Sequence, residues 1–409
     1  MKDKLLERFL RYISIDTQSN PESDETPSNK NEFKLARMLA EELKAMGFTD
    51  AHVDDNAYVM AGLASNVSHK VASIGFIAHL DTSPDMSGKN IKPQIHPDYD
   101  GGDIVLHEEK QIIMHADDFP ALKNYRGQTL ITGDGTTLLG ADNKAGIAAI
   151  MTAAEELATN PGIPHGAIKI GFTPDEEIGK GADHFDVKKF DADFAFTVDG
   201  GEVGELQYEN FNAAHARLWI RGRNIHPGEA AGKMINAMII GMEFNQMLPE
   251  MERPEHTTGY QGFYHIHSFK GDVDQAVLEY IVRDHDKQKF EQRKSRLRRA
   301  ASLLNEKYGK GSIRLEIKDQ YYNMHTRIIP VFDIIELARE AMKAVHVKPL
   351  IRPIRGGTDG ARLSYMGLPC PNLFTGGHNF HGRYEFIPLE SMEKATKVIL
   401  KIIELAARK

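Results

Sequence analysis

Two kinds of hydrophobic pattern alternate along the first 200 residues of the chain. Short apolar runs at 71–80, 167–172 and 194–198 are typical of strands that are buried on both faces of a sheet. Between and before them, apolar side chains recur at helical spacing, which predicts helices at 5–13, 33–46 and 147–157. Strands that alternate with helices predict an α/β fold, with a mixed and partly parallel sheet flanked by helices.

The pattern changes after about residue 205. Polarity alternates at 212–221 and 313–318, and a hairpin is expected at 263–270 and 275–283, as in half-exposed antiparallel strands. Surface helices are predicted at 234–248 and 287–308, and the α/β pattern returns with helices at 331–345 and 390–407. We therefore expect a discontinuous α/β domain, residues 1–206 and 321–409, that carries an inserted α+β domain, residues 207–320.

The composition excludes several classes of protein. Of 409 residues, 41% are hydrophobic and 26% charged, and the net charge of −8 gives no basic excess for nucleic acid or anionic membranes. No apolar run reaches the roughly 20 residues of a membrane span, and the charged residues near the N-terminus do not suit a signal peptide. The single cysteine, Cys370, permits no intrachain disulfide and is expected to be buried and inert. A cytoplasmic protein is expected.

Candidate metal ligands stand at the ends of the predicted strands. His79 and Asp81 end the first buried strand and point the same way, so the imidazole suits a metal ion and the carboxylate suits a supporting position. Taken alone, the pair is explained more simply by an ordinary polar strand end. Asp142 lies in a glycine-rich turn before a helix, where it suits either a helix N-cap or a carboxylate that bridges two metal ions.

Three further sites extend this pattern. Glu176 and Glu177 follow another strand directly, and adjacent like charges favour a cation, although a solvated acidic turn is the alternative. Asp199 ends a third strand, within a common Asp-Gly turn. His378 and His381 are both candidate ligands near the C-terminus. Because ligands gather at the carboxyl ends of strands in α/β sheets, we expect a His and carboxylate site that suits Zn²⁺, with Mn²⁺ or Co²⁺ as alternatives.

Four longer segments carry a family resemblance, at 78–85 (AHLDTSPD), 139–142 (LGAD), 172–182 (FTPDEEIGKGA) and 355–360 (RGGTDG). Together they are far more specific than any single motif. Through them the chain closely resembles the tripeptide aminopeptidases of the dizinc aminoacylase and glutamate carboxypeptidase family, nearly from end to end. The resemblance implies two Zn²⁺ per subunit, short peptide substrates and a homodimer.

The resemblance also implies a role for each site residue. The zinc ligands would be His79, Asp142, Glu177, Asp199 and His381, with Asp142 bridging the two ions. Glu176 would be the general base, Asp81 would steady the metal site, and His378 would be only a neighbour.

Four residues outside the metal site complete the implied machinery. His226 would stabilise the oxyanion, reaching in from the inserted domain and often from a dimer partner. Arg355 would clamp the C-terminal carboxylate of the peptide, which would favour substrates of one length. Arg283 and Asn224 are weaker candidates for the same pocket.

Other functions stay open at this point. A dipeptidase, a carboxypeptidase or an N-acyl amino acid deacylase of the same family would share the metal ligands and Glu176. A protein that binds metal or peptide without catalysis would not need Glu176 as a base. No role is predicted for residues 98–124.

Overall fold

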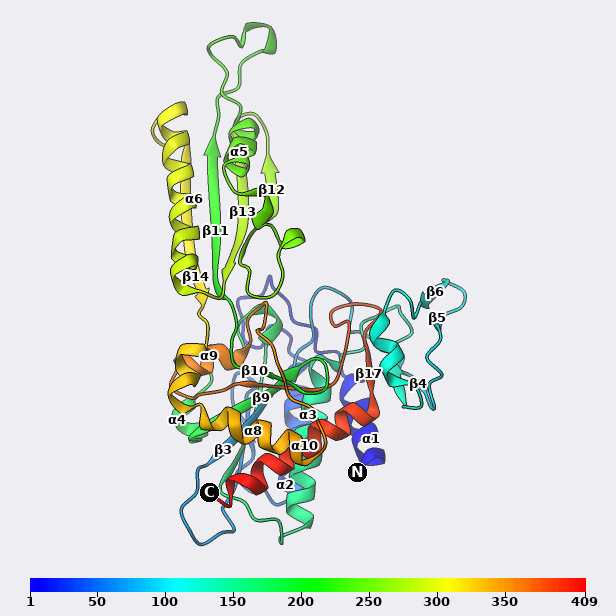
Figure 1. The fold of residues 1–409 in the computed structure, drawn as a ribbon. Helices are drawn as coiled ribbons and strands as arrows, with labels where there is room; N and C mark the ends of the chain where they lie inside the picture. Colours follow the sequence, from blue (N-terminus) through cyan, green and yellow to red (C-terminus); the bar gives the residue numbers. More distant parts are fainter. The chain divides into compact units, whose positions relative to one another are not determined.

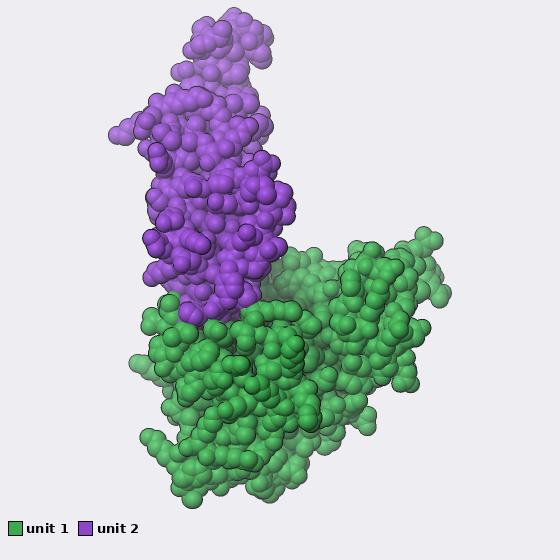
Figure 2. Space-filling model, in the orientation of Figure 1, with its two compact units in different colours: residues 1–208, 326–352, 358–409 green, residues 209–325, 353–357 purple.

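The computed structural model describes residues 1–409, which form two compact units (Figure 2). Unit 1 comprises residues 1–208, 326–352 and 358–409, and unit 2 comprises residues 209–325 and 353–357. The second unit includes a short segment, 353–357, from a stretch that the sequence pattern assigned to the first.

Unit 1 is built on an eight-stranded mixed sheet (Figure 1). In spatial order its strands are β1 (His52–Val53), β2 (Val59–Leu63), β8 (Ile168–Thr173), β3 (Ile74–His79), β9 (Phe194–Gly200), β16 (Asn372–Phe374), β10 (Glu205–Gln207) and β15 (Leu350–Ile351). The four central strands β8, β3, β9 and β16 are mutually parallel. Their carboxyl ends therefore lie along one edge of the sheet, as the sequence predicted.

Helices complete the layers of unit 1. They are α1 (Lys2–Ile13), α2 (Glu32–Ala45), α3 (Ala141–Thr159), α4 (Val187–Phe190), α7 (His325–Ile328, which begins at the boundary with unit 2), α8 (Asp333–Ala344), α9 (Asp359–Tyr365) and α10 (Leu389–Ala406). α3 packs on β3 and β9, and α1 and α10 pack on α3. A separate core joins Ile77 of β3 to Phe190 and Leu363, and Cys370 is buried in it as a free thiol whose pKa is raised by burial.

Unit 1 also contains two smaller sheets. One contains β17 (Phe386–Pro388), β7 (Leu130–Thr132) and β4 (Gln94–His96), and the other contains β5 (Ile104–His107) and β6 (Ile112–Met114). The segment 98–124, for which the sequence predicted no role, forms its own core around Met114 and Leu122, packed on Leu130 and Phe386. Its apolar residues therefore serve packing.

Unit 2 is a four-stranded antiparallel sheet with helices on one face (Figure 1). Its strands, in spatial order, are β12 (Phe263–Gly271), β13 (Gln275–Asp284), β11 (Asn212–Arg221) and β14 (Ile313–Tyr321), and its helices are α5 (Ala237–Gln246) and α6 (Lys287–Tyr308). α5 begins later than predicted because the Asn236 side chain caps it and accepts from the N–H groups of Met238 and Ile239. No helix of the chain combines the length and the apolar character needed to cross a membrane.

Candidate metal centre

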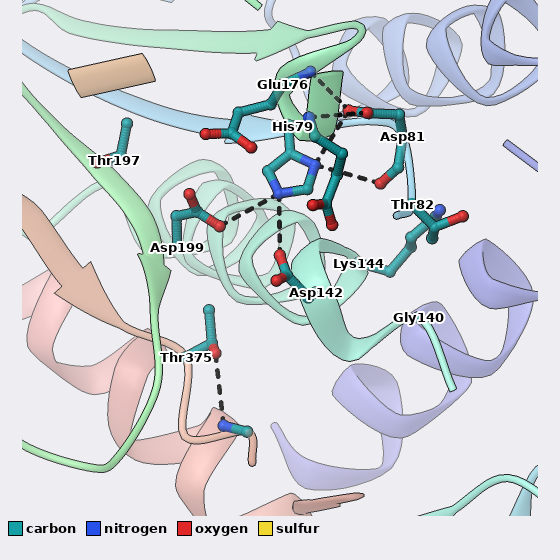
Figure 3. A network of polar contacts seen from close by, with 12 residues as sticks. His79, Asp81, Thr82, Gly140, Asp142, Lys144, Glu176, Thr197, Asp199 and Thr375 are labelled. Carbon is teal, nitrogen blue, oxygen red and sulfur yellow. Dashed lines mark hydrogen bonds and ion pairs between the residues drawn. The ribbon is translucent and has the colours of Figure 1, made fainter. Parts of the chain in front are cut away.

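Asp81 is the hydrogen-bonding hub of the site. His79 is the last residue of β3, and its Nδ1 lies 3.1 Å from Asp81 Oδ1 (Figure 3). The Asp81 carboxylate also accepts from the N–H groups of Glu176 (3.0 Å) and Glu177 (3.1 Å) and from the Ser19 hydroxyl (2.6 Å). Burial raises the pKa of Asp81, but these bonds outweigh it and lower that pKa overall. The ionised carboxylate thus fixes both the imidazole and the acidic turn.

Asp142 lies in the first turn of α3, at a kink where its own backbone angles (φ −82°, ψ 104°) are not helical. Its Oδ1 lies 2.9 Å from His79 Nε2, and its Oδ2 lies 3.4 Å from His381 Nε2. The helix start is held by the buried Glu385, whose carboxylate accepts from the N–H groups of Leu139, Gly140 and Asp142. The carboxylate of Asp142 therefore lies between two imidazoles.

A close approach brings α3 to the strand edge. The backbone at Gly146 lies so near β9 that a Cβ there would stand 2.0 Å from the carbonyl oxygen of Val198. Only glycine allows this distance. The start of α3 therefore reaches the end of β9, where Asp199 Oδ1 lies 3.3 Å from His79 Nε2 (Figure 3).

The acidic pair sits in a tight turn directly after β8. Asp175 adopts a left-handed conformation with φ of 54°, and its carboxylate accepts from the N–H of Ser28 at 2.8 Å. Glu177 Oε2 lies 3.0 Å from His381 Nε2, while its Oε1 is buried and has no hydrogen-bond partner. In Figure 3 the Glu176 carboxylate stands beside the His79 ring and has no hydrogen bond to the residues drawn. The two glutamates therefore differ in surroundings, as their adjacent positions allow.

The two C-terminal histidines are separated by their partners. His381 faces Asp142 and Glu177, whereas His378 Nε2 lies 2.6 Å from the hydroxyl of Tyr125 and is hydrogen-bonded to it. Burial lowers the pKa of His378 to about 4, which keeps its ring neutral. Only His381 lies among the carboxylates.

Three carboxylates of the site have raised pKa values, whereas hydrogen bonds from the imidazoles lower the pKa of Asp142. Burial, with the charge of Asp142 adding to it, raises the pKa of Glu177 to about 7 and that of Asp199 to about 6. Burial and the charge of Asp199 raise the pKa of Glu176 well above its usual range. More negative charge is gathered here than the side chains neutralise.

The imidazoles show the complementary shift. Hydrogen bonds to Asp142 and Glu177 raise the pKa of His381 to about 11. Burial lowers the pKa of His79, but Asp199 and Asp142 outweigh it and raise that pKa well above its usual range. Both imidazoles are therefore favoured in the protonated form, and a divalent cation bound among these carboxylates would displace those protons.

The donor set fits such cations. The ligand atoms of His79, Asp142 and Glu177 all lie within 4.8 Å of one another. The unpartnered Oε1 of Glu177 is a buried acceptor that a cation would satisfy. Imidazole and carboxylate ligands together suit Zn²⁺ and similar borderline ions.

The other four predicted site residues belong to unit 2. His226 is exposed and its Nδ1 accepts from the N–H of Gly228 at 3.2 Å, while the N–H of Asn224 donates to Asp274 at 2.8 Å. Arg283 donates to the backbone carbonyl groups of β11 and β13.

Arg355 also donates to backbone carbonyl groups. Its guanidinium bonds the oxygens of Thr257, Gly259 and Gln261 at 2.7–3.2 Å and packs over the rings of Phe211 and Phe263. These carbonyl bonds would have to be exchanged for bonds to a substrate carboxylate.

Three buried residues beside the site have no counterpart among the predicted ones. They are Glu385, Lys144 and Asp359. Lys144 donates to Thr17 Oγ1, and Asp359 accepts from Thr173 Oγ1 at 2.7 Å. Burial lowers the pKa of Lys144 to about 8 and raises that of Asp359 to about 7. The only sequence signal was that Asp359 lies within the segment 355–360.

Comparison with known proteins places the chain in a family. Residues 133–405 match the model of peptidase family M20/M25/M40. The chain is 60% identical to a peptidase T of Alkaliphilus oremlandii over 99% of both chains, and 56% identical to one of Geobacillus sp. over the full length of both. Among solved structures, its fold is similar to that of a Staphylococcus aureus tripeptidase (TM-score 0.81, 22% identity, 100% and 99% coverage) and of the aminopeptidase PepT of Bacillus cereus (0.77, 24%, 100% and 99%). The chain therefore belongs to peptidase family M20/M25/M40.

Proposed function

We propose that this protein is a metal-dependent aminopeptidase that removes the N-terminal residue of tripeptides. One observation carries the chemistry: a buried cluster of carboxylates and imidazoles, with an unpartnered acceptor on Glu177, surrounds the ring of His79 beside the carboxylate of Glu176. The full-length similarity to relatives named peptidase T supports the substrate class.

His79, Asp142, Glu177, Asp199 and His381 would hold two Zn²⁺ ions. When bound, the ions polarise the scissile carbonyl group and lower the pKa of the attacking water. The raised pKa values of Glu177 and Asp199 support this assignment, because cations would let these carboxylates ionise at neutral pH.

Glu176 would act as the general base. Its carboxylate takes a proton from the attacking water and returns it to the leaving amine. Asp81 positions the Glu176 backbone and the His79 ring together, so it couples the base to the metal ligands. No reaction step requires Asp81 itself to change its protonation state.

Residues of unit 2 would complete the reaction. His226 would donate a hydrogen bond to the oxyanion. Arg355 would bind the C-terminal carboxylate of the peptide, and Arg283 and Asn224 are weaker candidates for the same pocket. A clamp at a fixed distance from the metal ions would measure peptide length from the C-terminus, which explains a preference for tripeptides.

The test is hydrolysis of a panel of tripeptides, with dipeptides and N-acetylated tripeptides as controls. Wild type, Glu176→Gln and the exposed control Glu108→Gln are compared, and the metal content of each is measured. We expect release of the N-terminal residue from free tripeptides, a loss of at least about 100-fold in Glu176→Gln with its metal retained, and normal rates in Glu108→Gln. A preference for dipeptides or acylated amino acids would contradict the substrate, and an active Glu176→Gln would contradict the base.

We also propose that the protein is a cytoplasmic homodimer. The single, buried free cysteine agrees with a reducing compartment. Light scattering at micromolar concentration tests the dimer, and cell fractionation tests the location.

A further inference from the structure

A second cluster of metal-ligating side chains lies in unit 2. His215 on β11, His267 on β12 and Glu279 on β13 bring their ligand atoms within 4.8 Å of one another. They stand on the face of the sheet opposite the core, since the core-facing residues of β11 and β13 are the alternating ones such as Ala216 and Leu278. No part of the proposed peptidase reaction uses this cluster.

The register of the sheet explains why three separate strands meet here. β13 lies between β12 and β11, and Ile281 of β13 pairs with His215 on one side and with His265 on the other. Glu279 lies two residues along β13, on the same face as Ile281. A bulge in β12 between Ile266 and Ser268 leaves His267 without a pairing partner. Bulges redirect side chains, and this one sets the His267 ring beside Glu279.

The donors are available for a cation. The rings of His215 and His267 are 5.8 Å apart between centroids. Arg217 Nε lies 3.2 Å from Glu279 Oε1, which leaves the second carboxylate oxygen for a ligand bond. His215 and Glu279 are half-buried and His267 is exposed, so an ion can enter from solvent.

We propose that His215, His267 and Glu279 bind one borderline divalent cation, of the class of Zn²⁺, separately from the candidate metal centre of unit 1. Two imidazoles and one carboxylate are a donor set that such ions prefer, with water in the remaining positions. Bond lengths near 2.1 Å place tetrahedral ligand atoms about 3.4 Å apart, so modest side-chain rotations from the observed separation close the site.

The ion would fasten three strands to one another. It joins β12, β13 and β11 on the face of the sheet opposite the core that is shared with α5 and α6. The bound ion would therefore stabilise the folded sheet of unit 2, and hydrolysis of peptides by unit 1 would not depend on it.

The full-length protein is dialysed against about 10 µM free Zn²⁺ at pH 7.5, which fills a site with a Kd of about 1 µM to roughly nine-tenths. Bound zinc per chain is measured for wild type, His215→Ala, His267→Ala and the control His256→Ala, which removes an exposed histidine of the same unit. The comparison counts the difference between variants, so it does not depend on how many ions unit 1 holds.

We expect His215→Ala and His267→Ala each to bind one ion fewer than wild type, with peptidase activity retained, and His256→Ala to match wild type. Thermal unfolding gives a second readout, in which wild type and His256→Ala gain more in Tm from zinc than the other two variants. Equal zinc counts in wild type, His215→Ala and His267→Ala would overturn the proposal. Loss of the ion in His256→Ala as well would also overturn it, because the binding would then be spread over surface histidines.

Discussion

Replacing Asp81 by asparagine tests whether one buried carboxylate holds the candidate metal centre together. Asp81 Oδ1 is hydrogen-bonded to the His79 ring and accepts from the N–H of Glu176. Its Oδ2 accepts from the Ser19 hydroxyl and from the N–H of Glu177. Asparagine keeps only one of these oxygens. The least disruptive placement turns its amide group toward the Ser19 hydroxyl, which can accept, and leaves the N–H of Glu177 without a partner.

The size of the effect follows from this count. A lost hydrogen bond to a buried charged acceptor costs about 1.5–3 kcal/mol. At about 1.4 kcal/mol for each factor of ten, that is about a 10- to 100-fold effect, and removal of a residue that orients a metal ligand typically has the same size. We therefore expect Asp81→Asn to lose about 10- to 100-fold in metal affinity, in kcat, or shared between the two.

Metal titration by equilibrium dialysis and steady-state hydrolysis of a tripeptide measure these two quantities. Ser19→Ala is the matched control, because it removes one donor but keeps the carboxylate and its bonds to the other three groups. We expect a clearly smaller loss than in Asp81→Asn, since the carboxylate keeps its charge and its bonds to His79 and to the N–H groups of Glu176 and Glu177. If Asp81→Asn binds metal and turns over as wild type does, the carboxylate is not the hub, and the assignment of Asp81 is wrong.

Three further predictions concern the same unit. Gly146→Ala should unfold at clearly lower temperature in calorimetry, since its Cβ would meet the Val198 carbonyl at 2.0 Å; an unchanged Tm would show that α3 can move away. Glu385→Ala should lower metal affinity by displacing the backbone of Asp142, whereas a loss of stability without any loss of affinity would contradict a positioning role. Metal-free protein should lose stability as pH rises from about 5 to 8: the folded pKa values of Glu177, about 7, and His381, about 11, exceed their unfolded values, so the folded state binds more protons. The gain in Tm from added metal should therefore be larger at pH 8 than at pH 5.5, and an equal gain at both would contradict the shifts.

The strand-end residues could be predicted because their positions depend on a short-range pattern. His79 and Asp199 each end an apolar run, and parallel strands bring their carboxyl ends to one edge whatever the order of the strands. The family resemblance chose His381 over His378, and the separate partners of the two rings agree with that choice. The fold class and the long helices were predictable for the same reason, because each depends on a local period.

The supporting residues could not be predicted because their roles depend on distant contacts. Glu385 accepts from the backbone of Asp142, which lies 243 positions away in the chain. The cluster of His215, His267 and Glu279 depends on strand register and on one bulge, and neither leaves a signal in a single sequence. The core of segment 98–124 was missed because its strands are only three and four residues long, too short for a clear period.

The charges inside unit 1 link its chemistry to its stability. Lys144 is a buried cation beside the acidic residues Asp81, Glu32, Glu385 and Glu177, and burial lowers its pKa to about 8. One lysine cannot balance that many carboxylates, and the pKa values of Glu32, Glu385 and Glu177 are raised as a result. A chain that keeps so many acids buried without matching cations is suited to a bound state in which metal ions supply the missing positive charge. The same excess that destabilises the metal-free fold at neutral pH therefore favours metal binding, and metal affinity and fold stability should change together in variants of this site.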